Sequence, residues 1–189
     1  MSRLVGIAGL AGALLLGGCA RMPLGPPSAS MDNIVVARSS GIAPVSLGEF
    51  RLAAGRPAAL DEAVTARTNT YYSPYANSFA QYMKQTLAAD LRAAGLLDPA
   101  STTVVQGWLT DSRFEVPSGA AKAAVAARFV VLRAGKAVYD RELRAEADWK
   151  ASFIGAEALP DAVNRYGQLY RRLSATLLSD PDFRAAARP

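Results

Sequence analysis

The chain contains no histidine and only one cysteine among its 189 residues. Without histidine there is no Ser-His-Asp or Cys-His nucleophilic system, no imidazole ligand for a metal, and no usual general base near neutral pH. A single cysteine forms neither an internal disulfide nor a zinc site of several thiolates. These absences leave two catalytic routes, namely paired carboxylates of the kind that glycosidases use and Ser-Lys chemistry.

Neither of these two routes is favoured by the sequence. None of the four lysines lies in a Ser-x-x-Lys pattern. Four carboxylates share one face of a predicted strand, but Arg144 stands among them, which is typical of a solvated outer surface. The four are Asp140, Glu142, Glu146 and Asp148. We therefore expect a protein that is not an enzyme, and we predict no cofactor and no metal site.

The N-terminus combines Arg3 with the apolar run LVGIAGLAGALLLG at 4–17. This run is shorter than the about 20 apolar residues that cross a bilayer, and it has the length of a signal-peptide core. It ends in Leu16-Gly17-Gly18-Cys19, which resembles the bacterial lipoprotein signal: a leucine, two small residues and then the cysteine. The resemblance implies cleavage between Gly18 and Cys19, a diacylglyceryl group on the Cys19 thiol and acylation of the new amine. Membrane lipid is thus the first partner expected.

The residue that follows Cys19 is Ala20 and not Asp. In enterobacterial sorting, Asp at this position retains a lipoprotein in the inner membrane, so the resemblance implies the periplasmic side of the outer membrane. The net charge of +5 comes from scattered basic residues, among which Arg171-Arg172 is the one adjacent pair. An exported chain without a basic cluster is not expected to bind nucleic acid.

Three parts are expected along the chain. Residues 1–18 form the signal peptide. Residues 19–31 form the lipidated cysteine and a flexible tether, because ARMPLGPPSASM at 20–31 holds three prolines and no periodicity. Residues 32–189 form a single domain.

The first half of this domain is predicted to hold two strands and a helix. The segment 32–40 is typical of a strand, and 45–53 of a strand or a mixture of loop and strand. From Ser73 onward, apolar residues recur at a spacing that indicates an amphipathic helix. Ser73 is the expected N-cap, Pro74 the first helical residue and Gly95 the C-cap.

The second half is predicted to continue with three strands. The segment 101–117 forms a long strand with Trp108, Phe114 and Val116 on one face. The next two strands form a hairpin that turns at Ala134-Gly135.

The second arm of this hairpin alternates apolar and charged residues as far as Trp149, which indicates a half-buried strand. Pro160 and Asp161 open a second amphipathic helix, which Pro181 ends. The order of strands, helix, three strands and helix is typical of an α+β fold. We expect a mostly antiparallel sheet of about four to five strands with two amphipathic helices packed on one face.

Aromatic residues gather at the start of the first predicted helix. Because a tyrosine ring is apolar and its hydroxyl polar, tyrosines are enriched at binding surfaces. The cluster is the candidate surface for lipid or a partner; alternatively, its rings pack the start of the helix onto the sheet. Its members are Tyr71, Tyr72, Tyr75, Phe79 and Tyr82. A second apolar stretch contains Trp149, expected in the core, and a loop with Phe153 and Ile154, for which core and surface both stay open.

The stretch SFIGAEALPDAVNRYGQLYRRL at 152–173, completed by Leu178, Asp180 and Phe183, resembles small α+β lipoproteins of bacteria, as does YANSFAQYMKQTLAADLRAAG at 75–95. These include auxiliary lipoproteins of ABC-type intermembrane lipid transporters and YajG-like lipoproteins. The resemblance implies a non-enzymatic accessory or binding role in an envelope protein complex. Two alternatives stay open: a carboxylate-dependent hydrolase of envelope polymers, and a structural lipoprotein that self-associates through a strand edge.

Overall fold

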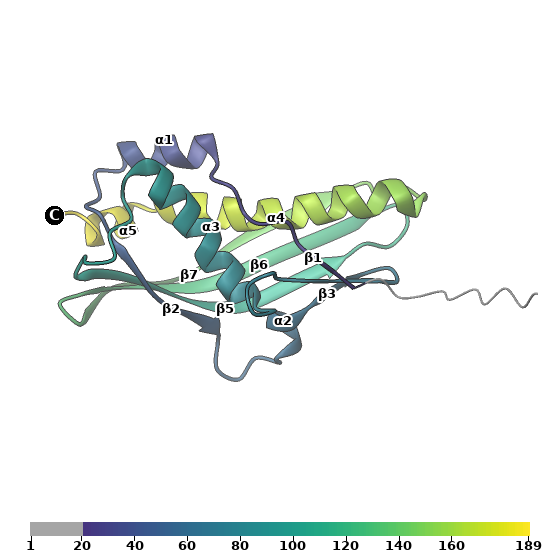
Figure 1. The fold of residues 1–189 in the computed structure, drawn as a ribbon, viewed down its shortest axis with the longest axis horizontal. Helices are drawn as coiled ribbons and strands as arrows, with labels where there is room; N and C mark the ends of the chain where they lie inside the picture. The colour runs from purple at the N-terminus through teal and green to yellow at the C-terminus, as the bar shows by residue number, and fades with distance from the viewer. Residues whose placement is uncertain (1–20) are drawn as a thin grey trace, which may run out of the picture.

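The larger of two sheets contains four long strands. The computed structural model of the protein describes residues 21–189 (Figure 1). Across the sheet the order is β2 (Ser46–Leu52), β5 (Thr103–Glu115), β6 (Ala121–Arg133) and β7 (Lys136–Trp149). β5, β6 and β7 are antiparallel neighbours, and β2 lies parallel to β5 at one edge.

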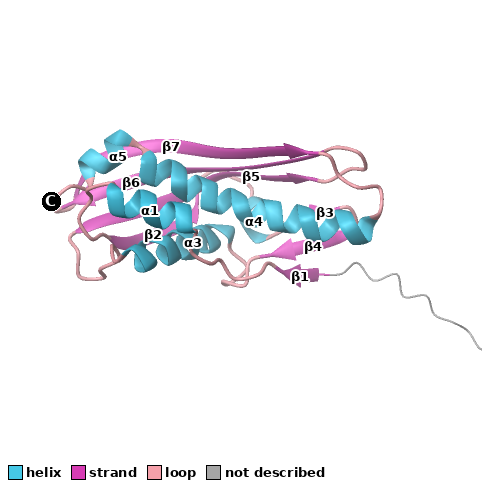
Figure 2. Ribbon diagram, turned by 90° about the horizontal axis from the view of Figure 1, so that it is seen from above, coloured by secondary structure: helices cyan, strands magenta, loops and turns pink. Residues whose placement is uncertain are grey.

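Helices cover one face of this sheet (Figures 1 and 2). The two longest, α3 and α4, carry the apolar stripes, and α1 packs on both of them. The helices are α1 (Met31–Ser39), α2 (Ala59–Glu62), α3 (Phe79–Ala94), α4 (Gly155–Ser179) and α5 (Pro181–Ala186). The predicted class is confirmed: an α+β fold with a mostly antiparallel sheet and two amphipathic helices on one face.

A smaller sheet lies at one end of the molecule. Its order is β1 (Arg21–Pro23), β4 (Asn69–Tyr72) and β3 (Val64–Ala66), with β1 parallel to β4. The next residue, Leu24, is buried, and its N–H donates to the Tyr72 carbonyl at 2.8 Å. Residues from Arg21 onward, expected within a flexible tether, therefore lie against the domain. The predicted signal peptide and Cys19 lie outside the described residues.

The core fills the space between the larger sheet and the helices. β7 buries Tyr139, Leu143 and Ala145 and exposes the charged residues between them, as the alternation predicts. The predicted hairpin turn is also confirmed, because Ala134 and Gly135 have the left-handed φ values of 48° and 78° that a tight turn needs. α4 buries residues spaced by three or four: Ala162, Tyr166, Leu169, Tyr170, Leu173 and Leu177.

The strand predicted at 32–40 is wrong, because this segment forms α1. Its Ile34-Val35-Val36 run favours a strand locally. However, the Asn33 side chain donates to Asp90 Oδ2 of α3 at 2.7 Å and to the Arg171 carbonyl of α4 at 2.9 Å. These contacts, made across a long stretch of sequence, override local propensity.

α3 begins later than predicted. Its N-cap is Ser78, whose hydroxyl accepts a backbone N–H of the first turn. Ala76 and Asn77 have φ values of 51° and 55°. A right-handed helix excludes these values, so no helix runs on from Ser73. The predicted end is confirmed, because Gly95 adopts the left-handed C-cap conformation with φ 77°.

α4 begins earlier than predicted, at Gly155, and holds Pro160 inside its N-terminal part. The proline lacks an N–H, so one helical hydrogen bond is missing there. At the other end, Pro181 does not lead into a tail but starts α5, for which Asp180 is the N-cap.

The alternation predicts Trp108 and Phe114 on the same face of β5, but the structure places them on opposite faces. Its register against β6 shifts between Leu109 and Asp111, so Thr110 is an extra residue in a bulge. Leu109 is buried before the bulge and Phe114 after it, and Trp108 therefore turns to the outer face of the sheet.

Candidate functional site

The five aromatic residues of the predicted binding surface do not share one exposed surface. Tyr71, Phe79 and Tyr82 are buried in the core, and Tyr72 and Tyr75 are half-buried. The Tyr71 ring contacts an aromatic ring of β5, and the Phe79 ring contacts two of α4. The ring of Tyr71 thus packs β4 against β5, and the ring of Phe79 packs the start of α3 against α4.

A chain of hydroxyl groups runs through this aromatic core. The Tyr166 hydroxyl lies 2.7 Å from Ser112 Oγ of β5 and 2.9 Å from the Tyr170 hydroxyl. Burial raises the pKa of both tyrosines well above the ordinary value, so both hydroxyls are neutral donors and acceptors. These hydroxyl groups join α4 to β5, and all three residues are buried.

We expect Tyr166→Phe to destabilise the protein by about 1 to 3 kcal/mol, because the Ser112 and Tyr170 hydroxyls lose a buried partner. Urea unfolding followed by circular dichroism measures this loss. Tyr75→Phe is the control, since Tyr75 is half-buried and also loses only its hydroxyl. Equal stability of the two variants would contradict the buried hydroxyl chain.

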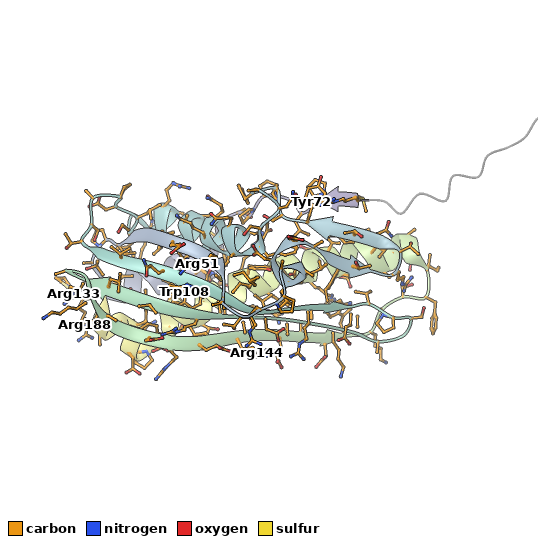
Figure 3. The ribbon with its side chains drawn as sticks, turned by 90° about the horizontal axis from the view of Figure 1, so that it is seen from below. Arg51, Tyr72, Trp108, Arg133, Arg144 and Arg188 are labelled. Carbon is orange, nitrogen blue, oxygen red and sulfur yellow. The ribbon has the colours of Figure 1, made fainter. Side chains whose placement is uncertain are left out.

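Arg51, Trp108 and Arg144 lie on the outer face of the larger sheet (Figure 3), which also carries pairs of opposite charges. Arg144 Nη1 lies 2.7 Å from Asp111 Oδ2, and Arg128 Nε lies 2.6 Å from Asp140 Oδ1. Burial alone would raise the pKa of Asp111, but hydrogen bonds from its arginines outweigh burial and lower it. The hydrogen bond from Arg128 is the main cause that lowers the pKa of Asp140.

These ion pairs form a network that does not favour acid catalysis. A catalytic acid needs a raised pKa, whereas arginines hold the pKa values of Asp111 and Asp140 low. A hollow of about 200 Å³ on this face is lined by charges of both signs: Arg113, Glu115, Lys122, Arg144, Glu146 and Asp148. Of the predicted carboxylates, Asp140 therefore faces an arginine, while Glu146 and Asp148 border this mixed hollow.

β1 and the start of α4 lie toward the same end of the molecule (Figures 1 and 2), and the side chains there form an apolar surface. The side chains of Phe153 and Ile154 are 79% and 59% exposed, and Met22 is 37% exposed. Beside them runs a groove of about 420 Å³ between β1 and α4, lined by Met22, Pro23, Tyr71, Leu159, Pro160 and Val163. We call these exposed side chains and the groove the apolar tip.

The loop that carries Phe153 is held by hydrogen bonds to its backbone. The Arg67 guanidinium donates to the carbonyls of Ser152, Phe153 and Val116, at 2.5, 3.3 and 3.4 Å. The Ile154 N–H donates to Ser152 Oγ at 3.1 Å. The two apolar side chains therefore project from a fixed loop. The sequence did not decide whether this loop belongs to the core or to the surface. The pattern that could have indicated an exposed apolar loop is an aromatic and an aliphatic residue directly before a glycine.

Comparison with known proteins finds no matching family model and no matching curated protein. Among solved structures, a Xanthomonas campestris protein of the DUF330 family has a TM-score of 0.56 at 8% identity, covering 85% of this chain and 93% of that chain. A candidate lipoprotein from Caulobacter crescentus has a TM-score of 0.48 at 10% identity, covering 79% and 95%. A minor lipoprotein from Acinetobacter baumannii has a TM-score of 0.40 at 11% identity, covering 73% and 94%. The first of these similarities shows a shared fold.

Within residues 21–189, no helix has the length and apolar character that crossing a bilayer requires. The same residues hold no group of three or more acidic, cysteine or histidine side chains placed to bind a metal ion.

Proposed function

We propose that this chain is a non-enzymatic lipoprotein of the bacterial envelope, held on the periplasmic side of the outer membrane by acyl chains on Cys19. The observation that carries the proposal is the sequence Leu16-Gly17-Gly18-Cys19, followed at Arg21 by the first strand of the domain. An α+β domain thus starts directly after the attachment residue. Two or three acyl chains hold such a domain stably on a membrane.

We further propose that the domain acts as an auxiliary subunit of a complex that transports or assembles envelope lipids. Three observations support this role. The sequence pattern of both long helices resembles such auxiliary lipoproteins, and the fold is shared with a DUF330 protein. The apolar tip also offers a surface that contacts lipid or a partner subunit.

We expect Cys19→Ser to abolish fatty acid incorporation and retention in the membrane fraction, because the hydroxyl does not take the thioether-linked diacylglyceryl group. Labelling of cells with an alkyne-bearing fatty acid, followed by fractionation, measures both effects. Ala20→Ser is the matched control, since it makes a change of similar size beside an intact thiol. Equal labelling of wild type and Cys19→Ser would contradict the anchor.

The accessory role predicts partners that depend on the anchor. Wild-type protein extracted from native membranes in mild detergent is expected to co-purify with transport or assembly proteins and with lipid, as identified by mass spectrometry. The Cys19→Ser protein is expected to lose this enrichment. Recovery of an acylated protein without any enriched component would contradict the accessory role and leave the lipid anchor standing.

A further inference from the structure

The distance between the predicted anchor and the folded domain is very short. One residue, Ala20, separates Cys19 from Arg21, which is already paired with β4. Three extended steps from Cys19 to Met22 span at most about 11 Å. Met22 itself lines the groove of the apolar tip.

Detachment of β1 would lengthen the link between Cys19 and the domain, but this detachment is costly. Arg21, Met22 and Pro23 are in register with Thr70, Tyr71 and Tyr72 of β4. The Leu24 side chain that follows is buried in the core. Release of β1 would therefore break this pairing and expose Leu24, so the end of the domain stays within about 11 Å of the anchored residue.

The headgroup layer of one leaflet is about 5 to 8 Å thick, which is comparable with this reach. Resting on the proposed lipid anchor, we propose that the apolar tip inserts Phe153 and Ile154 into the surface of the membrane that holds the acyl chains of Cys19. The occupant of the tip is thus the lipid surface. This contact fixes the orientation of the domain, whereas a tether would leave it free.

The construction of the tip fits a contact with lipid. Phe153 and Ile154 are the most exposed large apolar side chains at this end, and the next residue, Gly155, lines the apolar groove. Two hydrogen bonds from Arg67 hold the backbone of the loop, and a third joins Arg67 to the Val116 carbonyl, so the loop is fixed even without a partner. Aromatic and aliphatic side chains of this kind enter the boundary between headgroups and acyl chains.

The test uses the full acylated protein. Because an acylated Cys19 has no free thiol, Phe153→Cys introduces the one reactive thiol, at a side chain whose exposure of 79% makes the change compatible with folding. The thiol is labelled with the environment-sensitive fluorophore NBD. The matched control is Val35→Cys, which replaces a 62% exposed apolar side chain on α1, at the other end of the molecule (Figure 1).

Both labelled proteins are reconstituted into vesicles of phosphatidylethanolamine and phosphatidylglycerol. At position 153 we expect emission at shorter wavelength, a several-fold gain in intensity, and quenching by lipids that carry a spin label near the headgroup. At position 35 we expect none of these. Equal spectra at the two positions would overturn the proposal.

Four further outcomes are distinguished. A signal at 153 that grows with the ratio of protein to lipid would identify a second copy as occupant, and shielding only in native membranes would identify a protein. Either result overturns contact with lipid. Fatty acid labelling of the same preparation separates the two claims: an acylated protein with a water-exposed position 153 overturns only the tip, whereas an unacylated protein overturns the lipid anchor as well.

Discussion

Replacement of Phe79 by alanine is expected to destabilise the domain by about 3 to 5 kcal/mol. The ring is fully buried, packs edge-on against Tyr166 with 5.5 Å between ring centroids, and stacks on Tyr170 at 6.3 Å. Its removal leaves a cavity at the junction of α3 and α4. Urea unfolding measured by circular dichroism gives the change in the free energy of unfolding.

The control for this prediction is Tyr72→Ala, which also comes from the predicted aromatic surface. Tyr72 is half-buried, and the Arg21 guanidinium lies 5.1 Å from its ring centroid. We expect a loss below about 1.5 kcal/mol. If Phe79→Ala destabilised the protein no more than Tyr72→Ala, the assignment of Phe79 to the core would be contradicted.

Asp180→Ala is expected to cost about 2 to 4 kcal/mol. The Asp180 carboxylate accepts the N–H groups of Asp182 and Phe183 at the start of α5, at 2.8 and 3.3 Å. It also accepts the Tyr139 hydroxyl at 3.1 Å and pairs with Arg141 at 2.8 Å. Alanine removes the cap and leaves the buried Tyr139 hydroxyl without this partner. Urea unfolding at pH 7 measures the loss.

The stabilisation by Asp180 is also expected to depend on pH. Burial by itself would raise the pKa of Asp180, but the two N–H groups and Arg141 outweigh burial and lower it below 3.8. Since the folded pKa is lowered, the stabilisation is present above about pH 4 and is lost as the pH falls through the folded pKa. The difference between wild type and Asp180→Ala should therefore shrink in acid.

The control is Asp182→Ala, because Asp182 pairs with the same arginine but has a largely exposed side chain. Its loss should be below about 1 kcal/mol. A difference between wild type and Asp180→Ala that grew in acid, or that Asp182→Ala matched, would contradict the role assigned to Asp180.

Local patterns predicted the parts of the fold that local chemistry decides. The alternation up to Trp149 gave β7, the dipeptide Ala134-Gly135 gave the hairpin turn, and Gly95 gave the end of α3. In each case one short stretch of sequence contains the physical cause, whether burial of every second side chain or a left-handed backbone.

Other parts depend on contacts between distant residues, which no single stretch contains. The strand-like segment that became α1 is fixed by Asn33 and Asp90. The bulge at Thr110 moved Trp108 to the outer face, because an inserted residue inverts all later alternation. Gly107 shows the same limit: a Cβ there would lie 2.7 Å from the Phe50 ring, a close approach that only the packed sheet reveals.

The candidate site divides in the same way. The attachment residue Cys19 is predicted from four consecutive residues, whereas the apolar tip combines Met22 of β1 with Phe153 and Ile154. Apolar residues that directly follow a strand occur both at the edge of a hydrophobic core and in surface loops. The conformation of this loop depends on a contact between distant residues, because Arg67 donates hydrogen bonds to its backbone.

The most direct test of the proposed anchor is the mass of the N-terminal peptide of the mature protein, purified from native membranes. The proposal predicts a peptide that begins at Cys19 and carries a diacylglyceryl group on its thiol and a fatty acid on its amine. A peptide that still contains Gly18, or one that begins at Cys19 with a free thiol, would contradict it.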